Sequence, residues 1–143
     1  MTHPELVLDL VAKLEVLIAE PIDAGVTPAG HRRVIPITGG RVTGPRITGE
    51  VLGIGADWSA VRSDNVPVVT AQYLIRTDDG VVLTVTNTGA FTAQGIVTTP
   101  HIEAPEGPYA WLNDAVLAGT LVPLLDGARP LGVSLEFHQI RVK

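Results

Sequence analysis

Residues 37–58 constrain the fold most, because six glycines interrupt short runs of β-branched residues within this segment. Glycine inside strand-like sequence is typical of a turn, a bulge, or a place where another backbone or a ligand comes close. Glycines this dense predict a strongly bent β-sheet whose bends also shape a site. The segment ends in Asp57 and Trp58, so this pair is the first candidate for that site.

The composition indicates one globular domain, which we expect to span residues 1–143 and to bury a real core. Apolar residues make up 45% of the chain and charged residues 17%, which excludes a disordered protein. A net charge of −5 argues against a nucleic-acid partner. No segment has the pattern of a membrane span or a signal peptide, and the absence of cysteine fits a cytoplasmic location.

The pattern along the chain predicts an all-β fold. Residues 5–20 fit both a helical stripe and strict alternation, and a strand is favoured because the rest of the chain is β. A hairpin turn is expected at residues 77–80 and one or two helical turns at residues 109–117. Further strands are expected over residues 32–37, 41–43, 46–52, 66–77, 81–86, 94–102 and 133–142.

About eight short strands with little helix predict a single antiparallel β-barrel, lipocalin-like or allene-oxide-cyclase-like, with one short helical segment. A strongly curved sandwich is the alternative. The fifteen glycines and eleven prolines agree with many turns.

Three residues are candidates for catalysis. Asp57 fits a general base whose pKa is raised by the apolar wall of Trp58, and it fits a turn-capping aspartate equally well. Tyr73 and Arg76 are candidate donors to a developing oxyanion. They alternate on opposite faces of one strand, so the register decides which of the two reaches the interior.

Other polar and aromatic residues are candidates for ligand contacts. For Arg62 a structural ion pair with Asp64 is favoured over an oxygen contact, and for Asn87 a turn is favoured over a ligand contact. His101 and Glu103 share one strand face as a possible acid–base couple, which carries no function if that face is exposed. The full set of expected ligand contacts is Trp58, Arg62, Asn87, His101, Glu103, Trp111 and Asn113.

Metal and nucleotide chemistry are not expected. The four histidines show no metal-ligand spacing. The glycines form neither a phosphate loop nor a dinucleotide fingerprint, and there is no Gly-x-Ser-x-Gly elbow. We therefore expect no cofactor.

Several blocks in order resemble the bacterial and fungal family known as domain of unknown function 3237. The blocks are Pro36-Ile37-Thr38-Gly39-Gly40, Gly44-Pro45, Gly49-Glu50-Val51-Leu52, Gly55-Ala56-Asp57-Trp58, Arg62 with Asp64, Thr77-Asp78-Asp79-Gly80 and Tyr109-Ala110-Trp111-Leu112-Asn113. The resemblance covers residues 25–120. It implies a small antiparallel barrel that begins with a strand, self-associates as a homodimer and has a ligand-sized interior.

The chain departs from the family pattern at three places. Gly53 and Ile54 stand where Pro-Gly is usual, and Asn65 stands where glycine is usual. Gln72 replaces a frequent arginine, which weakens the inference that an anionic ligand carries over from relatives.

Three functions fit these observations. The first is a cofactor-independent isomerase, cyclase, lyase or hydrolase acting on a small apolar metabolite that carries a carbonyl, lactone or epoxide. The second is a barrel that binds a small ligand without turnover. The third is a structural or regulatory dimer whose barrel is filled by side chains. A buried Asp57 beside an open cavity would favour the enzyme.

Overall fold

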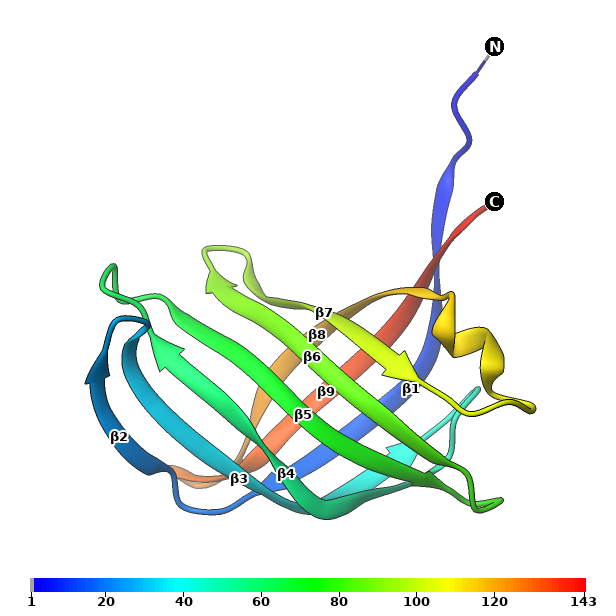
Figure 1. Ribbon diagram of the computed structural model, residues 1–143. Coiled ribbons are helices and arrows are strands. Elements are labelled where there is room, and N and C mark those ends of the chain that lie inside the picture. The colour runs from blue at the N-terminus through cyan, green and yellow to red at the C-terminus, as the bar shows by residue number, and fades with distance from the viewer. Residues whose placement is uncertain (1) are drawn as a thin grey trace.

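Nine β-strands and one 3-10 turn make up the chain in the computed structural model, which describes residues 2–143 (Figure 1). In chain order the elements are β1 (Leu6–Ile18), β2 (Ile22–Thr27), β3 (Gly30–Thr43), β4 (Gly49–Val61), β5 (Pro67–Thr77), β6 (Val82–Thr92), β7 (Gly95–Glu103), η1 (Ala110–Asn113), β8 (Val116–Asp126) and β9 (Arg129–Val142). The predicted all-β fold with one short helical segment is confirmed. No helix in residues 2–143 is long and apolar enough to cross a membrane.

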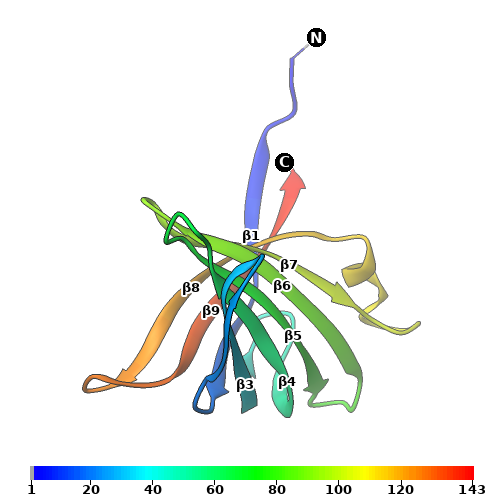
Figure 2. The same ribbon diagram turned by 60° about the vertical axis from the view of Figure 1, so that its left-hand side comes forward.

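Eight of the strands close into an antiparallel barrel, seen from two sides in Figures 1 and 2. Each strand from β3 to β9 pairs with the next, and β1 pairs with both β9 and β3. The closure is narrowest between β7 and β8, which pair only through Val97 with Thr120 and Thr98 with Gly119. β2 continues the path of β1 and pairs with the other half of β3, so it extends the wall beyond the closed part.

The alternation of side chains decides which residues reach the interior. On β5 the buried face carries Ala71, Tyr73 and Ile75. On β9 the buried face carries Leu135 and Phe137, as the alternation predicts. Part of the barrel is therefore filled by large apolar side chains, with Phe137 completely buried.

The glycines of residues 37–58 act as bulges and close-contact points. A Cβ on Gly40 (φ +149°) would lie 2.0 Å from the Glu15 carbonyl oxygen, where β3 meets β1. A Cβ on Gly55 (φ +113°) would lie 2.3 Å from the Gln72 carbonyl oxygen, where β4 meets β5. The register shifts beside both glycines. The prediction that Gly39-Gly40 separates two strands was wrong, because a bulge lets β3 continue through it.

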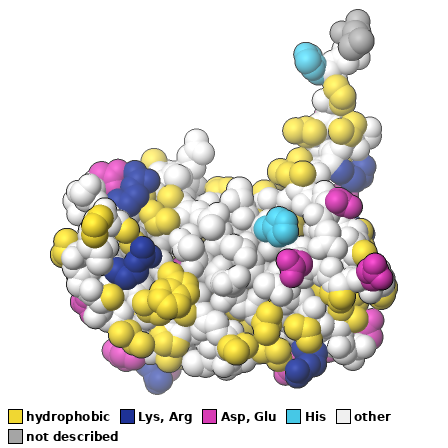
Figure 3. All heavy atoms as spheres, viewed as in Figure 1, with side chains coloured by type: hydrophobic (Ala, Val, Ile, Leu, Met, Phe, Trp, Pro, Cys, Tyr) yellow, Lys and Arg dark blue, Asp and Glu magenta, His cyan; other side chains and the backbone are white. Residues whose placement is uncertain are grey.

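One end of the barrel carries a two-stranded arm. The start of β1 pairs with the end of β9, and both project beyond the other strands (Figure 1). Leu6 and Leu8 on this arm are exposed, and hydrophobic side chains are visible along it in Figure 3.

Candidate functional site

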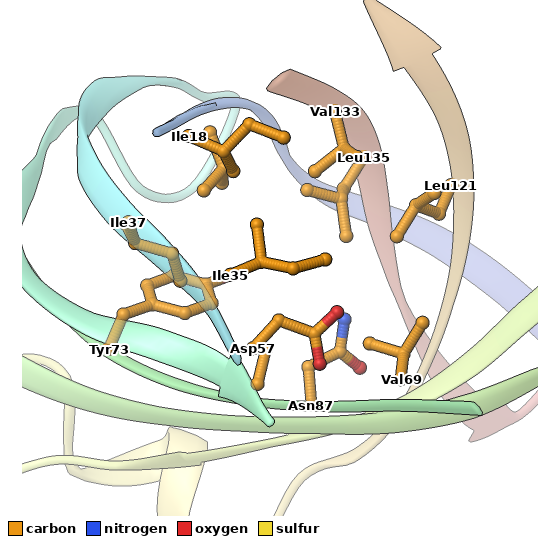
Figure 4. A pocket seen from close by; sticks show the side chains of 12 residues that line it. Ile18, Ile35, Ile37, Asp57, Val69, Tyr73, Asn87, Leu121, Val133 and Leu135 are labelled. Carbon is orange, nitrogen blue, oxygen red and sulfur yellow. The ribbon is translucent and has the colours of Figure 1, made fainter. Parts of the chain in front are cut away.

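A mostly apolar cavity opens within the barrel, between β1, β3, β4, β5, β6, β8 and β9 (Figure 4). Water-sized molecules have about 60 Å³ of room inside, and the space free of atoms is about 450 Å³ when the adjoining open solvent is included. The inner part thus holds a small group, and a larger ligand would extend through the mouth. The lining residues are Val16, Ile18, Ile35, Ile37, Asp57, Val69, Ala71, Tyr73, Asn87, Leu121, Val133 and Leu135.

Within residues 2–143, Asp57 is the only residue with a carboxyl group that lines this cavity. It lies within β4, opposite Ile35 of β3 and Ala71 of β5, so its carboxylate points inward. Burial raises the pKa of the Asp57 carboxyl. A hydrogen bond from the Thr70 backbone N–H (2.8 Å) and the charges of Arg32 and Arg33 oppose this rise. The carboxylate is therefore desolvated but keeps support for its anionic form.

The backbone ladder between β4 and β5 is interrupted beside Asp57. Pairing runs through Asp57 and Ala71 and resumes at Ala60 and Val68 in the same register. In the gap, the Asp57 carboxylate accepts the Thr70 N–H. The carboxylate takes the place of a backbone carbonyl as the acceptor for Thr70. This hydrogen bond holds the Asp57 side chain against β5.

Two further side-chain hydrogen bonds bind backbone carbonyls where the β4–β5 ladder is interrupted. The Ser59 hydroxyl donates to the Val68 carbonyl (3.0 Å). The Trp58 carbonyl accepts a hydrogen bond from the Arg32 guanidinium (2.5 Å). Side chains thus replace backbone partners on both strands where the ladder is interrupted.

Tyr73 and Asn87 bring unpartnered polar atoms to the cavity. The Tyr73 hydroxyl and both polar atoms of the Asn87 amide are buried and form no hydrogen bond within the described chain. Burial raises the pKa of the Tyr73 hydroxyl, which therefore stays protonated and acts only as a donor or neutral acceptor. Buried polar groups are rarely left unpaired, so water or a ligand is needed to satisfy these atoms.

Two of the other candidates on β4 and β5 lie on the outer surface. The Trp58 side chain is 52% exposed and does not line the cavity. Arg76 is exposed and forms an ion pair with Glu50 (3.6 Å) on the neighbouring strand. The register therefore brings Tyr73 inside and leaves Arg76 outside.

Three further candidates also lie away from the cavity. Arg62 forms a two-pronged ion pair with Asp64 (2.5 Å between Nη2 and Oδ2), which is the structural alternative. His101 and Glu103 share the exposed face of β7. The buried face of that strand instead carries Thr98 and Ile102.

The aromatic segment after β7 packs against the hydrophobic core, with Leu112 buried in the core and Tyr109 and Trp111 against it. The Arg46 guanidinium lies 3.6 Å from the centroid of the Trp111 ring. Asn113 exchanges two hydrogen bonds of 2.9 Å with the Ala104 backbone and holds the turn in place. Neither Trp111 nor Asn113 lines the cavity.

Sequence reasoning missed most of the apolar lining. Ile18, Val69 and Val133 lie at inward positions of their strands, and strict alternation is the signal that identifies them. Leu121 belongs to β8, a strand that the sequence did not predict. Of the ten candidates, the structure brings together Asp57, Tyr73 and Asn87.

The fold and the cavity define a class: closed antiparallel barrels with a small apolar interior into which a single carboxylate points. Within this class, the chain belongs to the family described as "Protein of unknown function (DUF3237)", which it matches over residues 6–97. A UPF0311 protein of Rhodopseudomonas palustris is 40% identical over 155 residues, covering 96% of this chain and 98% of its own. The predicted family resemblance is confirmed.

Solved structures show the same architecture. A beta-barrel like protein of Acinetobacter baumannii is 28% identical with a TM-score of 0.89, and the match covers 98% of this chain and 99% of that chain. A protein of Penicillium herquei described as an enzyme is 26% identical with a TM-score of 0.78, covering 99% of this chain and 98% of that chain.

Proposed function

We propose that this protein is a small-molecule enzyme that performs acid–base catalysis inside its barrel, with Asp57 as the base. One observation carries the proposal. A desolvated carboxylate and two unpartnered polar side chains, Tyr73 and Asn87, line one otherwise apolar cavity. Ionisable groups whose pKa is shifted by burial in a concave apolar site are typical of catalytic centres.

The proposed chemistry is a proton transfer beside an oxygen of the substrate. Asp57, as the anion, takes a proton from a carbon next to a carbonyl or from a hydroxyl group, and its raised pKa makes it a stronger base than an exposed aspartate. The Tyr73 hydroxyl and the Asn87 amide N–H donate hydrogen bonds to the substrate oxygen on which negative charge develops. Return of this proton from Asp57 to another carbon of the substrate completes an isomerisation. Its return to the oxygen of an opened epoxide completes a cyclisation, and its return to a leaving hydroxyl group completes an elimination. In a hydrolysis, Asp57 instead takes the proton of a water molecule that attacks the carbonyl carbon, and the leaving oxygen receives that proton.

The apolar lining indicates the kind of substrate. Val69, Leu121 and Leu135 present hydrocarbon to the space around Asp57. An apolar metabolite carrying one carbonyl, lactone or epoxide oxygen would satisfy both the lining and the two donors. The description of the Penicillium herquei relative as an enzyme supports turnover over passive storage.

Simple ligand binding is the second candidate. The apolar lining alone would suit a carrier, and the cavity argues against a barrel completely filled by side chains. A carrier has no need for an acid with a raised pKa, so Asp57 favours the enzyme.

The test is an incubation followed by mass spectrometry. The protein and its Asp57→Asn variant are mixed with a panel of small lactones, enones, epoxides and hydroxyketones. Asp64→Asn is the matched control, because Asp64 is exposed and lies outside the cavity. We expect conversion by the parent and by Asp64→Asn, and none by Asp57→Asn.

Other outcomes contradict parts of the proposal. Conversion by all three proteins would keep the enzyme but remove Asp57 from its mechanism. Retention of a panel compound after desalting, with no conversion, would support the binding barrel instead.

A further inference from the structure

A groove lies beside the cavity. Ile18 and Ile35 line both the groove and the cavity, so the two spaces are adjacent. Water-sized molecules have about 340 Å³ of room in the groove, several times the room in the cavity itself. A ligand too long for the cavity would therefore lie here. The groove is lined by Ile18, Ala19, Glu20, Pro21, Arg33, Ile35, Arg129 and Pro130.

The two arginines of this groove, Arg33 and Arg129, differ from the other arginines of the chain in their side-chain contacts. The chain has eight arginines. Six of them hold a side-chain hydrogen bond or an ion pair within the described chain, and they are Arg32, Arg41, Arg46, Arg62, Arg76 and Arg141. Within residues 2–143, Arg33 and Arg129 have no hydrogen bond from the guanidinium and no carboxylate within 4.0 Å.

The fold brings these two guanidinium groups to one place from distant parts of the chain. Arg33 lies on β3, two residues before Ile35 and on the same face, so it continues the inward row toward the mouth. Arg129 begins β9, after the turn from β8. Among residues 2–143, Glu20 is the one acidic residue that lines the groove. The charge of Arg33 also acts on Asp57 and Asp23, which do not line it. The groove lining therefore carries a net positive charge, next to an apolar cavity.

We propose that Arg33 and Arg129 bind the carboxylate end of a ligand whose apolar part lies in the cavity. Arginine binds carboxylates through paired N–H donors, and two free guanidinium groups at the mouth suit one such end. The inference rests on the proposed function only in that both use the same cavity, and it narrows the substrate class to apolar carboxylic acids.

The Gln72 substitution does not oppose this inference. The sequence suggested that loss of an arginine at this position weakens the case for an anionic ligand. Gln72 is exposed on the outer face of β5, so an arginine there would not reach the cavity. The positive charge at the mouth comes from different residues.

The test compares two probes of the same shape by isothermal titration calorimetry. One is 4-phenylbutanoate, and the other is the neutral 4-phenylbutan-1-ol. At low salt we expect the protein to bind the acid about tenfold more tightly than the alcohol. The Arg33→Gln/Arg129→Gln double variant should bind both equally and keep the parent's affinity for the alcohol. Arg41→Gln, which removes an exposed arginine paired with Asp78, is the control and should keep the preference.

Three results would overturn the inference. These are equal binding of both probes by the parent, a preference for the acid that survives in the double variant, and no binding of either probe. The Asp57→Asn variant separates this inference from the proposed function. It should lose turnover yet keep or strengthen its preference for the acid, because it removes a negative charge near the groove.

Discussion

Asp57 and Asn87 lie in the same row of inward-facing residues, separated only by Ala71 on the strand between them. Adjacent strands are about 4.8 Å apart, so the two Cα atoms are separated by about 10 Å. The small Ala71 side chain leaves the space above it open, and both polar side chains reach into that space (Figure 4). A carboxylate and an amide thus face one small volume, which is the geometry that a base and an oxyanion donor require.

The first prediction concerns the stability of the Asp57→Asn variant. Burial raises the pKa of Asp57 in the folded protein, so the folded state holds a proton more tightly than the unfolded state. Stability due to this group therefore falls as the pH rises from the ordinary aspartate range through the raised value. We expect Asp57→Asn to melt at a higher temperature than the parent at pH 7, by about 3–5 °C if the gain is about 1 kcal/mol. Calorimetry should show that the difference in melting temperature between Asp57→Asn and the parent is smaller at pH 4 than at pH 7. A difference that does not change with pH would contradict this prediction.

The second prediction concerns the pH dependence of turnover. The proposed base must be ionised, so kcat/KM should fall as the pH is lowered through the pKa of Asp57. Because burial raises that pKa, the fall should begin at a higher pH than an exposed aspartate would give. A profile of kcat/KM against pH with the substrate found above measures this. A rate that rises as the pH falls would indicate that Asp57 acts as an acid.

The third prediction concerns the unpartnered Tyr73 hydroxyl. Tyr73→Phe removes a buried hydroxyl that has no partner in the described chain, so its stability should stay the same or rise by up to about 1 kcal/mol. Turnover should fall by about 10- to 100-fold, because a donor to the developing oxyanion is lost. Urea denaturation and kcat measure the two effects. Loss of both stability and turnover would identify Tyr73 as a structural residue.

Much of the barrel is predictable because strand alternation is local. The faces of residues 70–77 and 133–142 can be read from the chain, and burial confirms both. The turn at residues 77–80 ends at Gly80 with φ +89°, the conformation that a glycine favours there. The first segment is β1, so its alternation, and not its helical stripe, describes the fold.

What the sequence hides depends on contacts across the barrel. β8 contains Gly119 and Pro123, residues that normally interrupt a strand. In the structure a Cβ on Gly119 would lie 2.6 Å from the Thr98 hydroxyl of β7, so only glycine fits there. That glycine is explained by a neighbour on another strand, which no local pattern reveals. In the same way, the inward choice between Tyr73 and Arg76 follows from closure of the whole sheet. The unpaired state of Arg33 and Arg129 is also visible only once all strands are in place.

The last prediction concerns the contact that closes the barrel. Gly40 pairs with Val16 across β3 and β1, and a Cβ there would meet the Glu15 carbonyl oxygen at 2.0 Å. Gly40→Ala should therefore lower the free energy of unfolding by at least about 3 kcal/mol, through steric clash and backbone strain together. Gly107→Ala is the matched control, because Gly107 has a similar φ (+133° against +149°) and nothing within 4 Å of its Cβ position. Its cost in urea denaturation should be about 1 kcal/mol, from strain alone. Equal costs for the two variants would show that the close approach of β1 and β3 at Gly40 contributes nothing to closure.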